Sequence, residues 1–170
     1  MTSIIKVDNI QNSSGTSALT IDSSGRVTQP AKPAFSAHGD DWFSLSSANS
    51  WIKISGFDTE RFDIGGNYNT SNQEFTVPVD GIYMVVLRAW LEGSVDSANY
   101  LRIRLNGTSS LAEVGENLNN NDDHTVQAVV LESLSAGDVI TPEGRRSVIH
   151  ATNDIFLGKH YAEFSAILMA

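Results

Sequence analysis

The hydrophobic pattern of the chain is that of β-strands, and residues 82–91 are apolar on both sides. The odd positions of this segment are all apolar, and the even positions are apolar except Arg88. Because successive side chains of a strand point to opposite faces, both faces of this strand are expected to be buried. Residues 125–134 show the same doubling, with Val126, Ala128 and Val130 on one face and Val129 and Leu131 on the other. Residues 100–105, in contrast, alternate cleanly between apolar positions and arginines.

The second face of these two strands needs a cover. An antiparallel sandwich with one solvated face alternates on every strand, so strands that are apolar on both sides indicate a sheet whose outer face is also buried. The sequence contains no long segment with a convincing helical period to act as that cover. The pattern therefore favours another copy of the protein. The alternative is a monomer in which single apolar side chains remain exposed.

Strand-like runs recur from residue 34 to the end of the chain. They are residues 34–37, 51–57, 73–78, 82–91, 100–105, 125–134, 138–141 and 161–169. Turn residues separate them, since Asn106-Gly107 suits the positive φ of a tight turn and residues 135–138 divide two runs. This spacing predicts an all-β sandwich. Residues 56–72 and 106–124 are expected to form longer polar loops, where recognition is expected to take place.

The first 32 residues form a short extended β arm of a different character. Their apolar residues come in brief bursts between Ser/Gly-rich turns, and the main ones are Ile5, Val7, Ile10, Leu19 and Ile21. So few apolar residues cannot offset a backbone entropy cost of about 1–2 kcal/mol per residue, so the arm is expected to pack on something else, for example on copies of itself. The two prolines in residues 29–33 interrupt strand pairing. We therefore divide the chain into an arm, residues 1–32, and a head domain, residues 33–170.

Composition narrows the function classes. Cysteine is absent, and the formal net charge of −9 argues against wrapping a nucleic-acid backbone, because phosphate affinity comes from clustered Lys and Arg. Arg145-Arg146, the adjacent basic residues, are expected to be a solvated loop pair. No segment approaches the roughly 20 apolar residues of a membrane span, and no apolar run of signal-peptide length is present, so we expect neither membrane insertion nor the usual secretion route.

Residues 75–83, Phe-Thr-Val-Pro-Val-Asp-Gly-Ile-Tyr, resemble the signature Phe-Thr-x-Pro-x-x-Gly-x-Tyr of the globular head of the complement and tumour-necrosis-factor-like superfamily. Further pieces fall in the family's order, namely residues 33–37, 65–69, 134–140 and 164–168, so the resemblance spans residues 33–168. The chain departs from the family at Ala166, where the closing pattern has Gly. It also carries no Gly-X-Y collagen repeat before the head, so the animal complement role is not implied.

The resemblance implies a ten-stranded jelly-roll sandwich that assembles as a three-fold trimer, with one sheet of each subunit turned toward its neighbours. The signature residues of the core are then Phe75, Pro78, Gly81, Tyr83 and Phe164. Met84 and Val86 are expected to face the trimer centre, and Val129 and Leu131 are assigned to the same interface.

The arm is similar to the amino-terminal segments of tailed-phage structural proteins, especially fibres of marine phages. Residues 5–11 and 18–27 carry this short resemblance. It implies a virion protein that assembles in the host cytoplasm and uses Ile5, Val7, Ile10, Leu19 and Ile21 to attach to other virion proteins of the tail or capsid. Its head would contact a host-surface glycan or protein.

Catalytic chemistry is not indicated. The four histidines are scattered, with no i, i+4 helical pairing and no partner for a nucleophile, so we expect no enzyme and no cofactor. Residues 119–124 offer oxygen ligands, but their spacing matches no defined calcium loop, and a solvated turn is expected instead of a metal site. Aromatic residues could stack on sugars if exposed, although they more often fill a core; these are Trp42, Trp51, Trp90, Tyr68 and Tyr100.

Three function hypotheses remain. The first is a homotrimeric fibre or spike protein of a tailed-phage virion, whose arm anchors it to the particle and whose head contacts the host, with avidity from three copies. The second is a capsid decoration or head-fibre protein, in which attachment is itself the function. The third is a free trimeric lectin-like binding protein.

Overall fold

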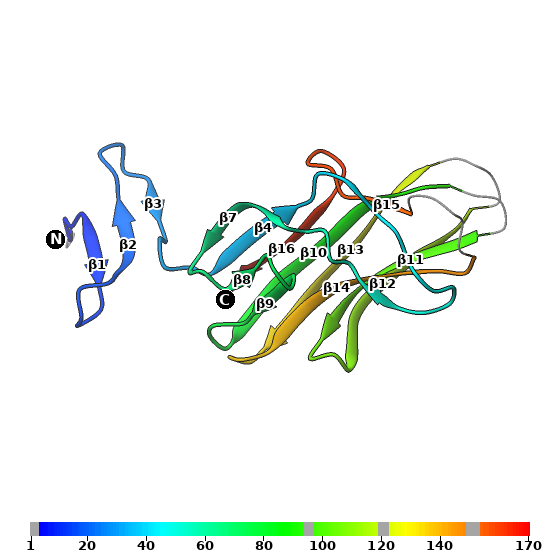
Figure 1. Cartoon of the computed structure of the whole chain (residues 1–170). Coiled ribbons are helices and arrows are strands. Elements are labelled where there is room, and N and C mark those ends of the chain that lie inside the picture. The colour runs from blue at the N-terminus through cyan, green and yellow to red at the C-terminus, as the bar shows by residue number, and fades with distance from the viewer. Residues whose placement is uncertain (1–3, 94–96, 119–122, 149–153) are drawn as a thin grey trace.

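The computed structural model describes residues 4–93, 97–118, 123–148 and 154–170. Its described residues form strands and no helix, arranged as a small sheet in the arm and a two-sheet sandwich in the head (Figure 1). No helix in this part of the chain is therefore long and apolar enough to cross a membrane. The all-β jelly-roll prediction is confirmed.

The arm forms its own antiparallel sheet, in the order β1-β2-β3. Its strands are β1 (Asn9–Gln11), β2 (Ser17–Ile21) and β3 (Val27–Thr28). Asx turns shape its two hairpins, because Asn12 Oδ1 accepts from the backbone N–H of Ser14 and Thr16, and Asp22 Oδ1 accepts from Ser24 and Arg26. The arm projects from the end of the head at which the C-terminus lies (Figure 1), and Lys32 Nζ donates to the Met169 carbonyl there.

The first head sheet, which we call sheet I, has seven strands in the described residues. Its path is β5 (Trp42–Phe43), β15 (Ile155–Phe156), β10 (Gly81–Leu91), β16 (Glu163–Leu168), β4 (Ala34–His38) and β7 (Thr59–Ile64), and β13 (His124–Leu134) pairs with β10 on its other side. The β10–β13 ladder runs without a bulge from Gly81–Leu134 to Leu91–His124. This uninterrupted register aligns the outward side chains of the two strands in rows.

The second head sheet, sheet II, has six strands in the described residues. Its path is β12 (Ser109–Leu118), β11 (Ser97–Leu105), β14 (Val139–Arg146), β9 (Glu74–Thr76) and β8 (Tyr68–Asn69), and β6 (Ile52–Lys53) pairs with β14. Phe35, Phe75 and Phe164 pack between the sheets, with ring centroids of Phe35 4.8 Å from Phe75 and 5.1 Å from Phe164. The core therefore joins both sheets through aromatic contacts.

The two segments expected to be long polar loops both contain strands. Residues 56–72 contain β7 and β8, and residues 106–124 contain β12 and the first residue of β13. The prediction failed at β7 because its exposed position at the edge of sheet I lets it carry Glu60, Arg61 and Asp63 beside Phe62 and Ile64. β12 is likewise the edge strand of sheet II and is mostly polar. Residues 119–122 of the oxygen-rich segment lie outside the described residues.

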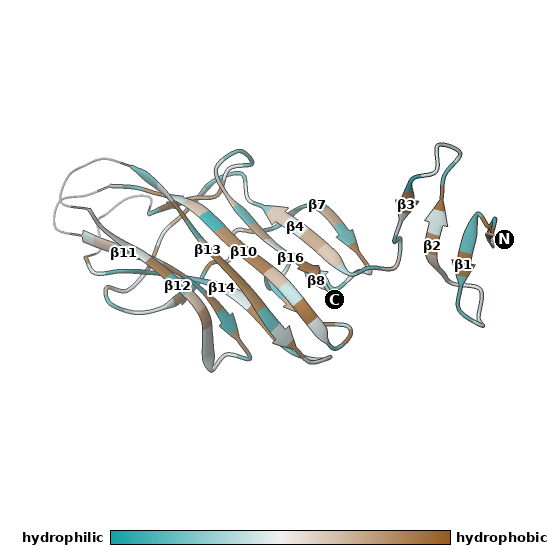
Figure 2. Ribbon diagram, turned by 180° about the vertical axis from the view of Figure 1, so that it is seen from behind, coloured by the Kyte–Doolittle hydropathy of each residue, from teal (hydrophilic) through white to brown (hydrophobic). Residues whose placement is uncertain are grey.

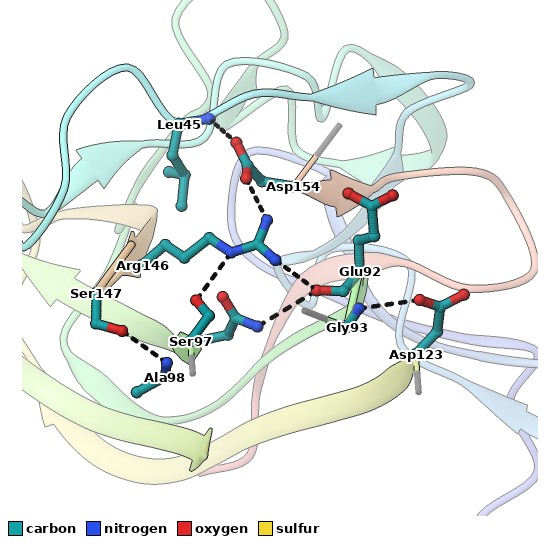
Figure 3. Close-up of polar contacts among 10 residues, drawn as sticks. Leu45, Glu92, Gly93, Ser97, Ala98, Asp123, Arg146, Ser147 and Asp154 are labelled. Atoms are coloured by element: carbon teal, nitrogen blue, oxygen red, sulfur yellow. Dashed lines mark hydrogen bonds and ion pairs between the residues drawn. The ribbon is translucent and has the colours of Figure 1, made fainter. Parts of the chain in front are cut away.

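The expectation that Arg145-Arg146 is a solvated loop pair was wrong. Both residues belong to β14, and Arg146 is fully buried (Figure 3). Its guanidinium bonds the carboxylate of Asp154, donates from Nε to Ser97 Oγ at 3.0 Å, and donates to the Glu92 carbonyl at 2.9 Å. Asp154 also accepts from the backbone N–H of Leu45 at 2.6 Å. A buried charge is tolerated here because its donors are satisfied by one carboxylate and two neutral acceptors.

Candidate subunit interface

The outward face of sheet I carries the candidate interface. Along β10 the odd positions from Tyr83 to Leu91 are buried in the core, while the even positions from Ile82 to Trp90 point outward and keep part of their surface exposed. Hydrophobic residues predominate along the middle of β10 and β13 (Figure 2). Both faces of β10 are thus apolar, but only one of them is covered by the chain itself.

The four residues assigned to the interface from the sequence lie together on this face. Met84 is the register partner of Leu131, and Val86 is the partner of Val129. Leu131 is 62% exposed and Val129 is 48% exposed. Two apolar pairs in adjacent rows of one ladder form a continuous surface, because directly opposed residues of an antiparallel pair have Cβ atoms about 5 Å apart.

Further residues extend this surface across the sheet. Ile167 on β16 is the partner of Met84, and Ala34 on β4 is the partner of Ile167 and of Ile64 on β7. Phe62 on β7 is 49% exposed and lines a shallow pocket of about 190 Å³ together with Met84, Ser165 and Ile167. The contribution of β7 escaped the sequence interpretation. The signal for it was the spacing of Phe62 and Ile64, two residues apart.

A polar row crosses this apolar surface. Arg88 lies opposite Gln127 on β13 and Glu163 on β16. The Arg88 Nε atom is buried and, among the described residues, has no hydrogen-bond partner. An unpaired buried donor costs free energy, so this row is a polar interruption of an otherwise apolar face.

An aromatic cluster continues the face beyond the polar row. Trp90 stacks on Tyr161 at a centroid distance of 4.7 Å, and Phe156 packs against Trp42 at 5.0 Å and against Tyr161 at 5.5 Å. Of the aromatic residues weighed for sugar stacking, Trp42 and Trp90 therefore belong to this cluster. Tyr68 is buried in the core, where it stacks on Phe35.

Most of the signature residues lie around the turn that starts β10, whereas Phe164 lies opposite Leu87 in the middle of that strand. Phe75, Tyr83 and Phe164 are fully buried, Pro78 is half-buried, and Gly81 is the first residue of β10. The Tyr83 hydroxyl donates to the Val79 carbonyl at 2.9 Å, and burial raises the pKa of this hydroxyl. A Cβ at Gly81 would lie 2.6 Å from the Ala170 carbonyl oxygen. The turn thus requires glycine where the C-terminal segment passes close to the backbone.

The arm residues assigned to virion attachment remain largely uncovered. Ile5 is 87% exposed, Val7 and Ile10 are also exposed, and Leu19 and Ile21 on β2 are half-buried. The arm sheet has one hydrogen-bonded layer and no second layer in the described residues. Its apolar side chains are therefore free to contact another molecule.

Within the ranges that the structure describes, no group of three or more His, Asp or Glu side chains is placed to hold a metal ion. The outward face of sheet I is built for contact through apolar side chains.

Comparisons with known proteins agree with this architecture. Residues 34–165 match the C1q domain. Among solved structures, the globular domain of zebrafish complement 1qA protein is similar, with a TM-score of 0.59, 20% identity, and coverage of 82% of this chain and 98% of that one. Murine APRIL is similar with a TM-score of 0.62, 11% identity, and coverage of 81% and 99%. Eiger TNF from S. frugiperda is similar with a TM-score of 0.54, 12% identity, and coverage of 82% and 94%. At these identities the solved structures show the shared fold alone.

Proposed function

The chain belongs to the C1q domain family, and from that premise we propose that it is a homotrimeric structural protein of a tailed-phage virion. In this proposal sheet I of each head is covered by its neighbours, the arm anchors the trimer to the particle, and the head contacts the host surface. Trimer assembly is typical of the family.

The observation that carries the trimer is the outward face of sheet I. It presents Met84, Val86, Val129 and Leu131 in two adjacent rows, and the described residues cover Met84 and Val86 only in part and leave Val129 and Leu131 exposed. A contiguous apolar face of this kind is typical of a protein–protein contact. Closed cyclic symmetry lets every copy bury the same face, as a homotrimer requires.

Attachment through the arm is supported by the sheet that the arm forms, which is separate from the two sheets of the head. Exposed Ile5 and Ile10 have no core to enter, and the arm extends away from the head (Figure 1). Such a segment gains stability only by packing on another surface. Its similarity to the amino-terminal segments of phage fibres supports other virion proteins as that surface.

The proposal is tested by locating the protein. Antibody labelling of purified virions followed by negative-stain microscopy is expected to mark the tail. Labelling spread over the capsid would instead indicate a decoration or head-fibre protein. Virions that carry none of the protein would overturn both structural roles and favour a free trimeric binding protein.

A further inference from the structure

The outward face of sheet II carries a cluster of aromatic and arginine side chains, which we call the Trp51 platform; it consists of Trp51, Tyr100, Arg102 and Arg145. This face lies on the other side of the sandwich from the outward face of sheet I, which is the face assigned to the trimer contact. Tyr100 on β11 is the register partner of Arg145 on β14, and Trp51 immediately precedes β6, which pairs with β14. Strands distant in sequence thus place these side chains side by side.

The rings and guanidinium groups of the platform are in direct contact. The Arg102 guanidinium lies 4.2 Å from the centroid of the Trp51 ring, and the Arg145 guanidinium lies 5.0 Å from Tyr100 and 5.9 Å from Trp51. The Tyr100 ring lies over Gly115, where a Cβ would come within 2.0 Å of it. Stacking of this kind holds a guanidinium by its faces and leaves its edge to bind acceptors.

Arg145 differs from the neighbouring arginines in its electrostatic environment. Arg102 donates to Glu143 at 2.6 Å, and Arg104 lies 3.6 Å from the same carboxylate. Among the residues that the structure describes, Arg145 makes ring contacts but no hydrogen bond or ion pair, and its Nε is buried without a partner. The chain has a net charge of −9, yet no carboxylate of the described residues pairs with this cation.

We propose that the Trp51 platform binds an acidic saccharide, with the sugar carboxylate on the edge of Arg145 and the sugar ring against Trp51. A carboxylate matches the planar guanidinium fork, and the C–H face of a sugar ring matches an aromatic ring. This inference rests on the proposed contact with a host surface and names the chemistry of that contact.

A neighbouring concavity supports a saccharide longer than one unit. It has a volume of about 500 Å³ and is lined by Lys53, Glu74, Asn106, Thr141 and Glu143 among others. Lys53 and Glu143 are register partners, and Glu143 lies two residues from Arg145 on β14. Such mixed donors and acceptors suit the hydroxyl groups of an adjoining sugar unit.

The charges around the platform favour a sugar over a nucleic acid. Glu113 and Glu143 are the register partners of Arg102, and Glu74 lies across the concavity. A phosphate backbone carries closely spaced charges, and these carboxylates would repel it. A saccharide with a single acidic unit carries one charge, which it can place on Arg145, and its neutral units then meet Glu74 and Glu143 without charge repulsion.

The test uses the full chain and three probes: a short galactose oligomer that ends in one galacturonic acid unit, the all-galactose oligomer of the same length, and a single-stranded oligodeoxynucleotide. Titration calorimetry is expected to show at least about tenfold tighter binding of the acidic sugar than of the neutral one, because the charge-assisted contact with Arg145 is lost in galactose. Equal binding of the two sugars, no sugar binding, or preference for the oligonucleotide would each overturn the proposal.

Variants locate the site. Arg145→Gln is expected to remove the preference for the acidic sugar, Trp51→Leu is expected to weaken both sugars, and the exposed control Lys159→Gln is expected to change neither. Light scattering and thermal melting of each variant establish that it is folded and assembled. If Arg145→Gln does not fold, the proposal is judged on two other results, which are the loss of sugar binding in Trp51→Leu and the preference of the unmodified protein for the acidic sugar. If a folded Arg145→Gln variant binds the acidic sugar as tightly as the unmodified protein does, the assignment of the site is overturned.

The two proposals fail separately. If the protein is found on virions but binds no acidic sugar, only this inference is refuted. If it binds the sugar but is absent from virions, only the proposed location is refuted.

Discussion

Met84 and Leu131 face each other directly across the β10–β13 ladder, and both point away from the core. Replacing Met84 with lysine is expected to dissociate the trimer while each head stays folded. An unpaired charge in a dry interface costs about 3–5 kcal/mol, and a three-fold assembly contains three of them. Sedimentation velocity and circular dichroism measure the two properties separately.

A lysine at Thr108 is the matched control for this substitution. Thr108 is exposed in the turn between β11 and β12, on sheet II. The Thr108→Lys variant adds the same charge and is expected to keep the mass of the unmodified protein. A Met84→Lys protein that also keeps this mass would show that a different face forms the contact.

Phe164 tests the core independently of assembly. It is fully buried, with its ring near those of Phe35, Phe57 and Tyr68. Phe164→Ala removes these contacts and leaves a cavity, so it is expected to lower the free energy of unfolding by about 3–5 kcal/mol. Denaturant titration followed by near-ultraviolet circular dichroism measures the loss. A change well below 1 kcal/mol would show that this ring is not part of the packed core.

The buried pair of Arg146 and Asp154 gives a third prediction (Figure 3). Asp154→Asn leaves the buried guanidinium without its carboxylate, and the expected destabilisation is about 3–5 kcal/mol. The double variant Arg146→Met, Asp154→Leu removes both charges and is expected to be more stable than Asp154→Asn. A double-mutant cycle of Asp154→Asn, Arg146→Met and the variant with both substitutions measures the coupling energy between the two side chains. Additive changes in the free energy of unfolding would contradict the contact.

Asp138 gives a pH-dependent prediction. Its pKa is lowered because its carboxylate accepts hydrogen bonds from the Asn106 side chain and from the backbone N–H of Ser135. A lowered pKa in the folded state contributes stability above the ordinary value of about 4, and this contribution is lost as the pH falls through the lowered value. Asp138→Asn is therefore expected to reduce the melting temperature at neutral pH and to flatten its fall in acid. If the melting temperatures of the two proteins fall in parallel as the pH is lowered from neutral into acid, this role of Asp138 is contradicted.

The sequence was informative about the head because its strongest signals are local. The apolar residues on both faces of 82–91 indicated that this strand is covered on both sides, and the segment around Phe75 and Tyr83 resembled a family signature closely enough to predict the jelly roll. Both signals come from a few neighbouring residues that the pleat and one turn constrain.

Other features could not be predicted because they depend on pairing between distant strands. Arg146 is buried because residues from four separate segments meet around it, and nothing in its immediate neighbours indicates this. The contact of Trp51 with Arg102 likewise requires the register of β6, β14 and β11. The edge strands β7 and β12 were mistaken for loops because edge strands carry many polar residues.

The mass of the protein in solution tests the central claim most directly. Multi-angle light scattering at micromolar concentration is expected to give three times the mass of one 18.4 kDa chain. A mass equal to that of a single chain would contradict the claim that other copies cover Met84, Val86, Val129 and Leu131.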